Sequence, residues 1–361
     1  MEEDFNFKIY EPPSDRRYWV VKADAGKFYE IFTDNSLIAI GHLNEFVSER
    51  HYSSPFVFSS DNIRRAMTRL RGNKEYYNSN NYGQVNSFVN EMKRGDWVLT
   101  KGNGVIRVGR IESDAMLDND VSTAIVNEGT RYEKIVEMDF MLKRDVCWGP
   151  IVNIDHLPID IFLSLKSPMT LYNIDRYMES ICYCIYPYFK INNSLHFSIR
   201  INQKDELRNF YITKIFEYLN ELEFLSKIDQ DSMSDCDLAD LYHELAISEG
   251  FNLSTQASFH SPGDIWAKLG FSGTSVTSKM MYAVLVYAML FGNTHLGVDG
   301  VLDLESRKKM WEVLIKRIDM DVTKEAVAKL ELGMPNYDTK EIEKEIADTT
   351  ENERHNKTHQ D

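Results

Sequence analysis

The stretch from Tyr18 to His42 most constrains the fold, because three short elements follow one another within it. Residues 18–22 are a run of aromatic and β-branched residues that ends at a lysine, and the small residues 23–26 favour a turn. Apolar residues then recur at helical spacing over residues 27–35, and residues 37–41 return to strand-forming types. The stretch therefore predicts a strand, a short helix and a second strand.

A second group of strands is expected downstream. The segment FVNEMKRGDWVLT at residues 88–100 ends in an apolar run, and Gly102-Asn103-Gly104 separates it from the run at residues 105–111. Gly-Asp and Gly-Asn-Gly turns between short strands are typical of a small, strongly curved barrel.

The order of these segments resembles a known family. A strand WVVKA, a glycine turn, a helix, IAIG, a long helical excursion, FVNEMKRGDWVLT, GNGVIRVGRI and EKIVEMDFMLKRDV follow one another. This order resembles the EVE-like domain of the PUA superfamily, found at the N-terminus of Mrr-type and other modification-dependent restriction proteins. The likeness covers residues 16–172. It implies a curved β-barrel whose pocket reads modified or flipped-out bases in DNA or RNA, in a role of defence against foreign DNA.

The resemblance also carries residues into such a pocket, from the turn after the first strand and from the strand after the helix. These are Trp19, Lys22, Ala23 and Asp24 on one side, and Ile40, Gly41 and His42 on the other. Trp97, beside a Gly-Asp turn, is expected to supply another wall. Core packing is the alternative for both tryptophans, and a satisfied turn residue is the alternative for His42. An unpaired lysine is costly to bury, so we expect Lys22 at a rim or against an anion.

Charge is distributed unevenly in a chain whose formal net charge is −15. A basic island lies between residues 61 and 110, where cations outnumber carboxylates: Arg64, Arg65, Arg69, Arg71, Lys74, Lys93, Arg94, Lys101, Arg107 and Arg110. Such an island suits phosphate contact, since neutralised phosphates release counterions. The alternative is a solvated helix face over residues 62–71 with some structural ion pairs.

The 361 residues are enough for two domains. We expect an EVE-like domain at residues 16–175, an α+β and helical module at 190–333, and a disordered charged tail at 334–361. The overall class is therefore α+β, with a curved barrel followed by an α+β module. Residues 1–15 are expected to be a loose segment that Pro12-Pro13 keeps from forming a helix. Oligomerisation, recruitment of a companion defence protein and effector output are the roles considered for the second module.

Within the first domain, polar composition predicts loops at residues 73–83 and 113–131. A buried helix is expected over 175–189, where apolar and aromatic residues recur closely.

The second module begins with SLHFSIRI at residues 194–201, where alternation predicts a half-buried strand with His196 outward. Helices are expected over 205–225 and from an Asp235 cap to Gly250, and again over 303–332. The alternating run at 251–259 is expected to pair with residues 194–201. The phrase FHSPGDIWAKLG that follows is similar to a strand-SPG-helix junction, and its structural interpretation is a tight turn.

The apolar run at residues 280–292 raises a membrane question. Spanning a bilayer needs about 20 residues, and shorter runs are more often buried helices. We expect a buried or oligomeric helix here, with a membrane-associated effector as an alternative.

Catalytic motifs are absent from the sequence: no phosphate-binding loop, nucleophile elbow or HExxH pair occurs. Two loose groups of acids with a lysine were weighed as metal-nuclease sites, namely Asp155, Asp160 and Lys166, and Asp299, Asp303, Glu305 and Lys308. A nuclease of unrecognised type therefore stays an alternative, but no metal or cofactor is expected.

Four cysteines without CxxC spacing, and no export signal, favour a cytoplasmic protein with reduced thiols.

Overall fold

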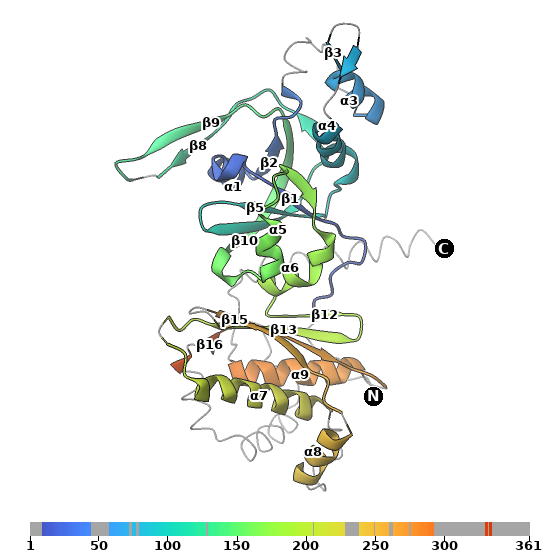
Figure 1. Cartoon of the computed structure of the whole chain (residues 1–361), viewed down its shortest axis with the longest axis vertical. Coiled ribbons are helices and arrows are strands. Elements are labelled where there is room, and N and C mark those ends of the chain that lie inside the picture. The colour runs from blue at the N-terminus through green and yellow to red at the C-terminus, as the bar shows by residue number, and fades with distance from the viewer. Residues whose placement is uncertain are drawn as a thin grey trace. The chain divides into compact units, whose positions relative to one another are not determined.

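The chain forms two compact α+β units in a computed structural model (Figure 1). The N-terminal unit comprises residues 13–181, and the C-terminal unit comprises residues 9–12 together with residue 182 onward. The structure describes residues 9–44, 58–71, 74–76, 79–127, 129–204, 206–227, 238–248, 250–259, 263–273, 276–291, 329–330 and 332–333. The expected α+β class is confirmed.

A curled half-barrel sheet forms the N-terminal unit, with strand order β11-β1-β5-β6-β10-β2. Its strands are β1 (Tyr18–Val21), β2 (Leu37–Ile40), β5 (Trp97–Lys101), β6 (Val105–Ile111), β10 (Leu142–Asn153) and β11 (Leu171–Asn173). The pair β1 and β5 is parallel, and the other neighbours are antiparallel. The long strand β10 pairs with β2 and the short β7 (Met116–Leu117) at its start and with β6 further on, and a register shift interrupts it after Trp148. Such a bulge increases local bending, which suits a curled sheet.

Helices and two hairpins surround this sheet. The helices are α1 (Tyr29–Asp34), α3 (Ser60–Met67), α4 (Ser79–Asn86), a π-helical turn (Ser87–Glu91) and α5 (Ile159–Ser164). The hairpins are β3 (Arg69–Arg71) with β4 (Lys74–Tyr76), and β8 (Ser122–Val126) with β9 (Lys134–Met138). Short 3-10 turns lie at residues 24–26, 154–156 and 175–177. The unit's hydrophobic core gathers Trp19, Phe32, Ile38, Phe88 and Trp148, among others.

Both expected loops of the N-terminal unit are wrong. Residues 73–83 contain β4 and the start of α4, and residues 113–131 contain β7 and β8. The hairpin of β8 and β9 lies beside α1 in Figure 1, where Ala124 and Val136 are buried. On its other face, Ile125 and Ile135 are directly paired and exposed. Since apolar residues occur on both faces, the segment lacks the clean alternation that marks a strand.

The C-terminal unit is a sheet covered by helices. Its strand order is β12-β13-β15-β14, from β12 (Tyr188–Ile191), β13 (Ser194–Ile201), β14 (Ser254–Ser258) and β15 (Gly263–Gly270), while β16 (Leu332–Gly333) pairs with the end of β13. Helices α7 (Asn209–Lys227) and α9 (Val276–Phe291) pack side by side in Figure 1, and α8 (Leu238–Ile247) follows α7 along the chain. Helix α6 (Met178–Ile185) crosses the boundary between the two units.

Two expectations for this unit are corrected. Strand β14 pairs with β15 and not with β13, because β15, which begins at Gly263, lies between them. Strand β13 is covered on both faces, so His196 and Ser198 are buried instead of pointing outward. Both residues contact Tyr183 of α6, which covers the second face.

Residues 9–12 are not a loose segment, because Ile9 and Tyr10 are buried in the C-terminal unit. Ile9 joins its hydrophobic core, and Tyr10 stacks on Tyr186 with ring centroids 4.0 Å apart. Pro12 then precedes the start of the N-terminal unit at Pro13.

Helix α9 is a core helix. Met280, Ala283, Val284 and Tyr287 are buried in the hydrophobic core of the C-terminal unit. Across the described ranges, no helix combines the length and apolarity needed to cross a membrane. The Asp235 cap, the candidate acids Asp299, Asp303 and Glu305, and the tail at 334–361 lie outside the described residues. So does the helix expected at 303–332, apart from residues 329–330 and 332.

Candidate nucleic-acid interface

Two lysines lie side by side where the parallel strands β1 and β5 end. The register pairs Tyr18 with Trp97 and Val20 with Leu99, so Lys22 and Lys101 occupy equivalent positions at the same edge of the sheet. Lys101 is exposed and Lys22 is half-buried. The Lys22 ammonium donates a hydrogen bond to the backbone oxygen of Ser167 and lies 5.9 Å from the Tyr172 ring centroid.

Positive charge accumulates at this edge without a compensating carboxylate. Burial, and after it the charge of Lys101, holds the pKa of Lys22 below its usual value. Among the described residues, no carboxylate forms an ion pair with Lys22 or Lys101. A bound anion would relieve the repulsion that Lys101 exerts on the charged form of Lys22.

The turn after β1 has an unusual backbone. Asp24, Ala25 and Gly26 have positive φ angles of 47°, 54° and 94°. Positive φ is uncommon outside glycine, and its clustering often marks a functional site. Gly26 lies against the Lys101 carbonyl and Asn103, so the strained turn adjoins the two lysines. The Ala23 carbonyl, which accepts the Gly26 and Phe28 N–H groups at 3.0 Å, fixes the turn.

His42 reaches the same edge through Gln84, a residue that sequence reasoning missed. The buried Gln84 side chain accepts the N–H groups of Thr170 and Leu171, each at 2.9 Å, and the Lys22 N–H donates to the Thr170 carbonyl at 2.8 Å. Burial lowers the pKa of His42, and a hydrogen bond with Gln84 opposes that shift. The His42 Nε2 atom is buried and has no hydrogen-bond partner within the described chain. A neutral imidazole with one uncommitted nitrogen is therefore connected to the Lys22 backbone through Gln84 and Thr170.

The two tryptophans lie in the core, which was the alternative left open by the sequence. Trp19 is 1% exposed, and its indole N–H donates to Asp96 at 3.0 Å. Trp97 is buried and packs edge-on against Tyr18. Gly41 lies against the Phe140 ring, where a Cβ atom would come within 2.6 Å. Lys22 and His42, and not the indoles, are therefore the polar groups available at this edge.

Strand β5 divides the basic island in two. Lys101 is its last residue, and Arg107 lies opposite Thr100, whereas Lys93 and Arg94 precede its start. The strand spans about 13 Å, so these are separate surfaces. Arg107 donates to the Gly149 carbonyl at 3.1 Å, and Arg110 pairs with Glu112 at 2.9 Å. Further cations are Arg64 and Arg65, exposed on α3, while the side chains of Arg69, Arg71 and Lys74 lie outside the description.

The acids weighed for a nuclease have other contacts. Asp160 accepts the Ser180 hydroxyl at 2.6 Å and the Ile161 N–H at 2.8 Å, at the start of α5. Asp155 is exposed, and the Lys166 ammonium lies over the Phe162 ring at 4.8 Å. Within the described residues, no three His, Cys, Asp or Glu side chains are grouped to hold a metal ion. Cys147, Cys182 and Cys184 form no disulfide, and Cys236 lies outside the described residues.

No protein-family model, curated protein or solved structure matches this chain.

Proposed function

We propose that the N-terminal unit binds nucleic acid at the edge where β1 and β5 end. In this proposal, Lys22 and Lys101 contact phosphates, because paired lysines without a carboxylate partner attract a polyanion and release its counterions. The observation that carries the proposal is the juxtaposition of these two lysines by the parallel register. The adjacent turn with its positive φ angles supports a functional edge.

His42 supplies a group for recognition of a base. Neutral imidazole donates through one nitrogen and accepts through the other, so His42 suits the hydrogen-bonding edge of an unstacked base once the groups that cover its Nε2 atom move aside. Gln84 holds the ring in place. Together with the EVE-like resemblance, these features support a PUA-type reader of a modified or flipped base. The biological role that we propose is a sensor in defence against foreign DNA, with the C-terminal unit serving oligomerisation, recruitment or output.

The phosphate part of the proposal is tested by comparing lysines at the two ends of β5. We expect Lys22→Ala and Lys101→Ala each to weaken binding of a fluorescent oligonucleotide and to lower the salt-dependence slope by about one unit. Lys93→Ala is the matched control, because it removes the same charge from an exposed position before β5. Fluorescence anisotropy over a salt series measures both quantities. Equal losses for all three variants would indicate a net-charge effect and contradict this surface.

The base-reading part of the proposal is tested by measuring how strongly the protein discriminates between plain and modified bases. The full-length protein is titrated with oligonucleotides that carry plain or modified bases, single-stranded and duplex. We expect His42→Ala to reduce the preference among bases while keeping the salt slope, since the ring contacts no phosphate in this proposal. A variant that stays folded and keeps the wild-type preference would remove His42 from the recognition site.

A further inference from the structure

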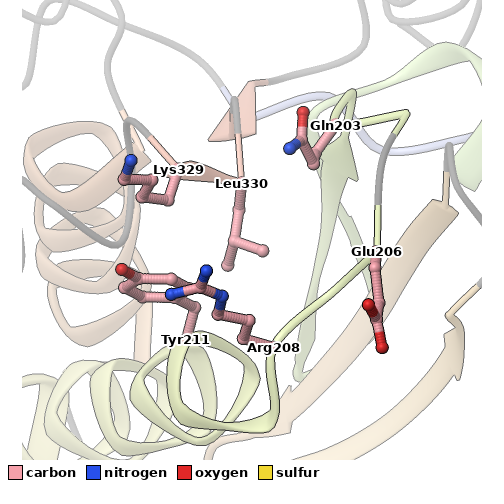
Figure 2. Close-up of a pocket in the computed structure, with 6 residues that line it drawn as sticks. All are labelled: Gln203, Glu206, Arg208, Tyr211, Lys329 and Leu330. Atoms are coloured by element: carbon pink, nitrogen blue, oxygen red, sulfur yellow. The ribbon is translucent and has the colours of Figure 1, made fainter.

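The C-terminal unit contains a pocket whose residues belong to neither of the two basic surfaces at the ends of β5. Its volume is about 300 Å³, and it opens between the end of β13, the start of α7 and the segment that precedes β16 (Figure 2). Six residues line it: Gln203, Glu206, Arg208, Tyr211, Lys329 and Leu330.

The walls of this pocket are held in place by backbone contacts. The Gln203 N–H donates to the Leu330 carbonyl at 3.3 Å, and Leu330 is buried in the hydrophobic core. Strand β16 pairs with Arg200 and Ile201 immediately beyond. Tyr211 is buried in the first turn of α7, and its N–H donates to the Arg208 carbonyl at 3.0 Å. The pocket is therefore preformed from two segments that are far apart in the sequence.

Cations dominate the charge of the pocket. Figure 2 shows the Arg208 guanidinium, the Lys329 ammonium and the Tyr211 hydroxyl on the same side, whereas the Glu206 carboxylate points away. Within the described part of the chain, neither Arg208 nor Lys329 has an ion pair or hydrogen bond through its side chain. The first turn of α7 also lacks acidic residues that would offset the positive end of its dipole.

We propose that this pocket binds the phosphoryl group of a small phosphorylated molecule. The planar guanidinium of Arg208 presents paired donors to two phosphoryl oxygens, and Lys329 adds a point charge. Two cations match a dianion better than a single carboxylate. The Gln203 amide and the Tyr211 hydroxyl supply further polar contacts, and the buried Leu330 closes the pocket towards the hydrophobic core. The volume suits a small molecule and excludes a nucleic-acid helix.

Binding here has a structural consequence for the unit. Arg208 precedes α7, and Lys329 belongs to the segment that continues into β16. A ligand that contacts both side chains links that segment to the helix. Because the unfolded chain lacks this arrangement, the ligand stabilises the folded C-terminal unit.

Calorimetric titration of the full-length protein with pyrophosphate, at constant ionic strength, tests the proposal. We expect Arg208→Gln and Lys329→Gln each to weaken pyrophosphate binding by about tenfold or more. Lys204→Gln is the matched control, because Lys204 is an exposed lysine of the same loop that does not line the pocket. Circular dichroism checks that each variant is folded.

Two further arms make the result decisive. Acetate is expected to bind much more weakly than pyrophosphate, and equal binding of the two would overturn the assignment to a phosphoryl group. Lys22→Ala is expected to bind pyrophosphate normally, which separates this pocket from the nucleic-acid surface. Absence of pyrophosphate binding to the wild type, or unchanged binding in both pocket variants, would overturn the proposal.

Discussion

His196 is a buried side chain whose charge state is set by its surroundings. Its Nδ1 atom shares a hydrogen bond of 2.8 Å with the Tyr183 hydroxyl, and the Phe189 ring stacks on it at 4.7 Å. Burial, followed by the charge of Lys268, lowers the pKa of His196 to about 3. The imidazole is therefore neutral in the folded protein at pH 7.

Acid should destabilise the C-terminal unit through this residue. The unfolded chain binds a proton to His196 near pH 6.5, whereas the folded chain does so only near pH 3. The stabilisation by neutral His196 is complete above pH 6.5 and is lost as the pH falls towards 3. From this group we expect the free energy of unfolding to fall by up to about 3 kcal/mol between pH 7 and pH 4. Urea unfolding of the wild type and of His196→Gln at both pH values measures this, and equal pH dependence in the two proteins would contradict it.

At the scale of single residues, the sequence supports a prediction where the energetic cost of burial alone decides a position. Lys22 was expected at a rim because an unpaired buried lysine is unfavourable, and it is half-buried. Alternation along the strand predicted that His196 points outward, but His196 is buried. The alternation of one strand gives no information about α6, which covers the second face. Gln84 was missed because it lies in a polar stretch, and its importance comes from backbone groups of Thr170 and Leu171 far along the chain.

At the scale of elements, one arginine joins a strand to a helix end. Arg144 of β10 is 1% exposed, and its guanidinium donates to four carbonyls, of Phe88, Val89, Met92 and Ser113. Carbonyls at a helix end lack partners within the helix, so Arg144 satisfies the end of the π-helical turn. Burial lowers the pKa of Arg144 to about 10, with Asp114 and Asp96 opposing the shift, and the side chain stays charged at pH 7.

Replacing Arg144 should loosen this junction. We expect Arg144→Met to lower the free energy of unfolding of the N-terminal unit by about 2–4 kcal/mol, because several buried carbonyls lose their donors. Arg144→Lys should restore only part of that loss, since an ammonium lacks the fork of donors. Arg107→Lys is the control, because Arg107 is only half-buried. Chemical denaturation measures the change, and wild-type stability in Arg144→Met would show that the contacts contribute nothing.

Elements were predictable where apolar periodicity was clean. The strands at 105–111 and 194–201 were predicted at their observed limits. The apolar run at 280–292 was predicted as a buried helix, and the observed helix α9 begins four residues earlier. The hairpin of β8 and β9 was not, because it is exposed on one face and held by α1 on the other. Strand β15 was not predicted, because the Ser-Pro-Gly signal at its start favours a tight turn and describes only local backbone.

At the scale of the whole molecule, the chain contributes to the C-terminal unit twice. Residues 9–12 belong to it, residues 13–181 form the other unit, and residue 182 onward returns to it. The Lys190 N–H donates to the Tyr10 carbonyl at 2.8 Å, and the Lys190 ammonium pairs with Glu11 at 2.8 Å.

Substitutions in this short segment should act on the unit that lies later in the sequence. We expect Ile9→Ala to destabilise the C-terminal unit by about 2–4 kcal/mol through loss of core packing. Hydrogen exchange should then increase in β12 and β13 and stay unchanged in β1 and β5. Glu11→Ala is the control, because a surface ion pair contributes only about 0–1 kcal/mol. Faster exchange confined to the N-terminal unit would contradict this division of the chain.

The sequence indicated two domains, and the observed boundary between Ile181 and Cys182 falls within the expected division at 175–190. Pro12-Pro13 was read as the end of a loose segment. Four residues are too few to show periodicity, so the burial of Ile9 and Tyr10 could not be predicted from local pattern.

The return of the chain to its starting unit has a consequence during translation. Ile9 and Tyr10 are synthesised before residues 13–181, whereas Tyr186 and Lys190, which Tyr10 contacts, are synthesised only after them. The N-terminal unit can fold while residues 9–12 still lack the part of the C-terminal unit that they contact. A nascent chain stalled before residue 182 would therefore present an uncovered isoleucine and tyrosine to cellular chaperones.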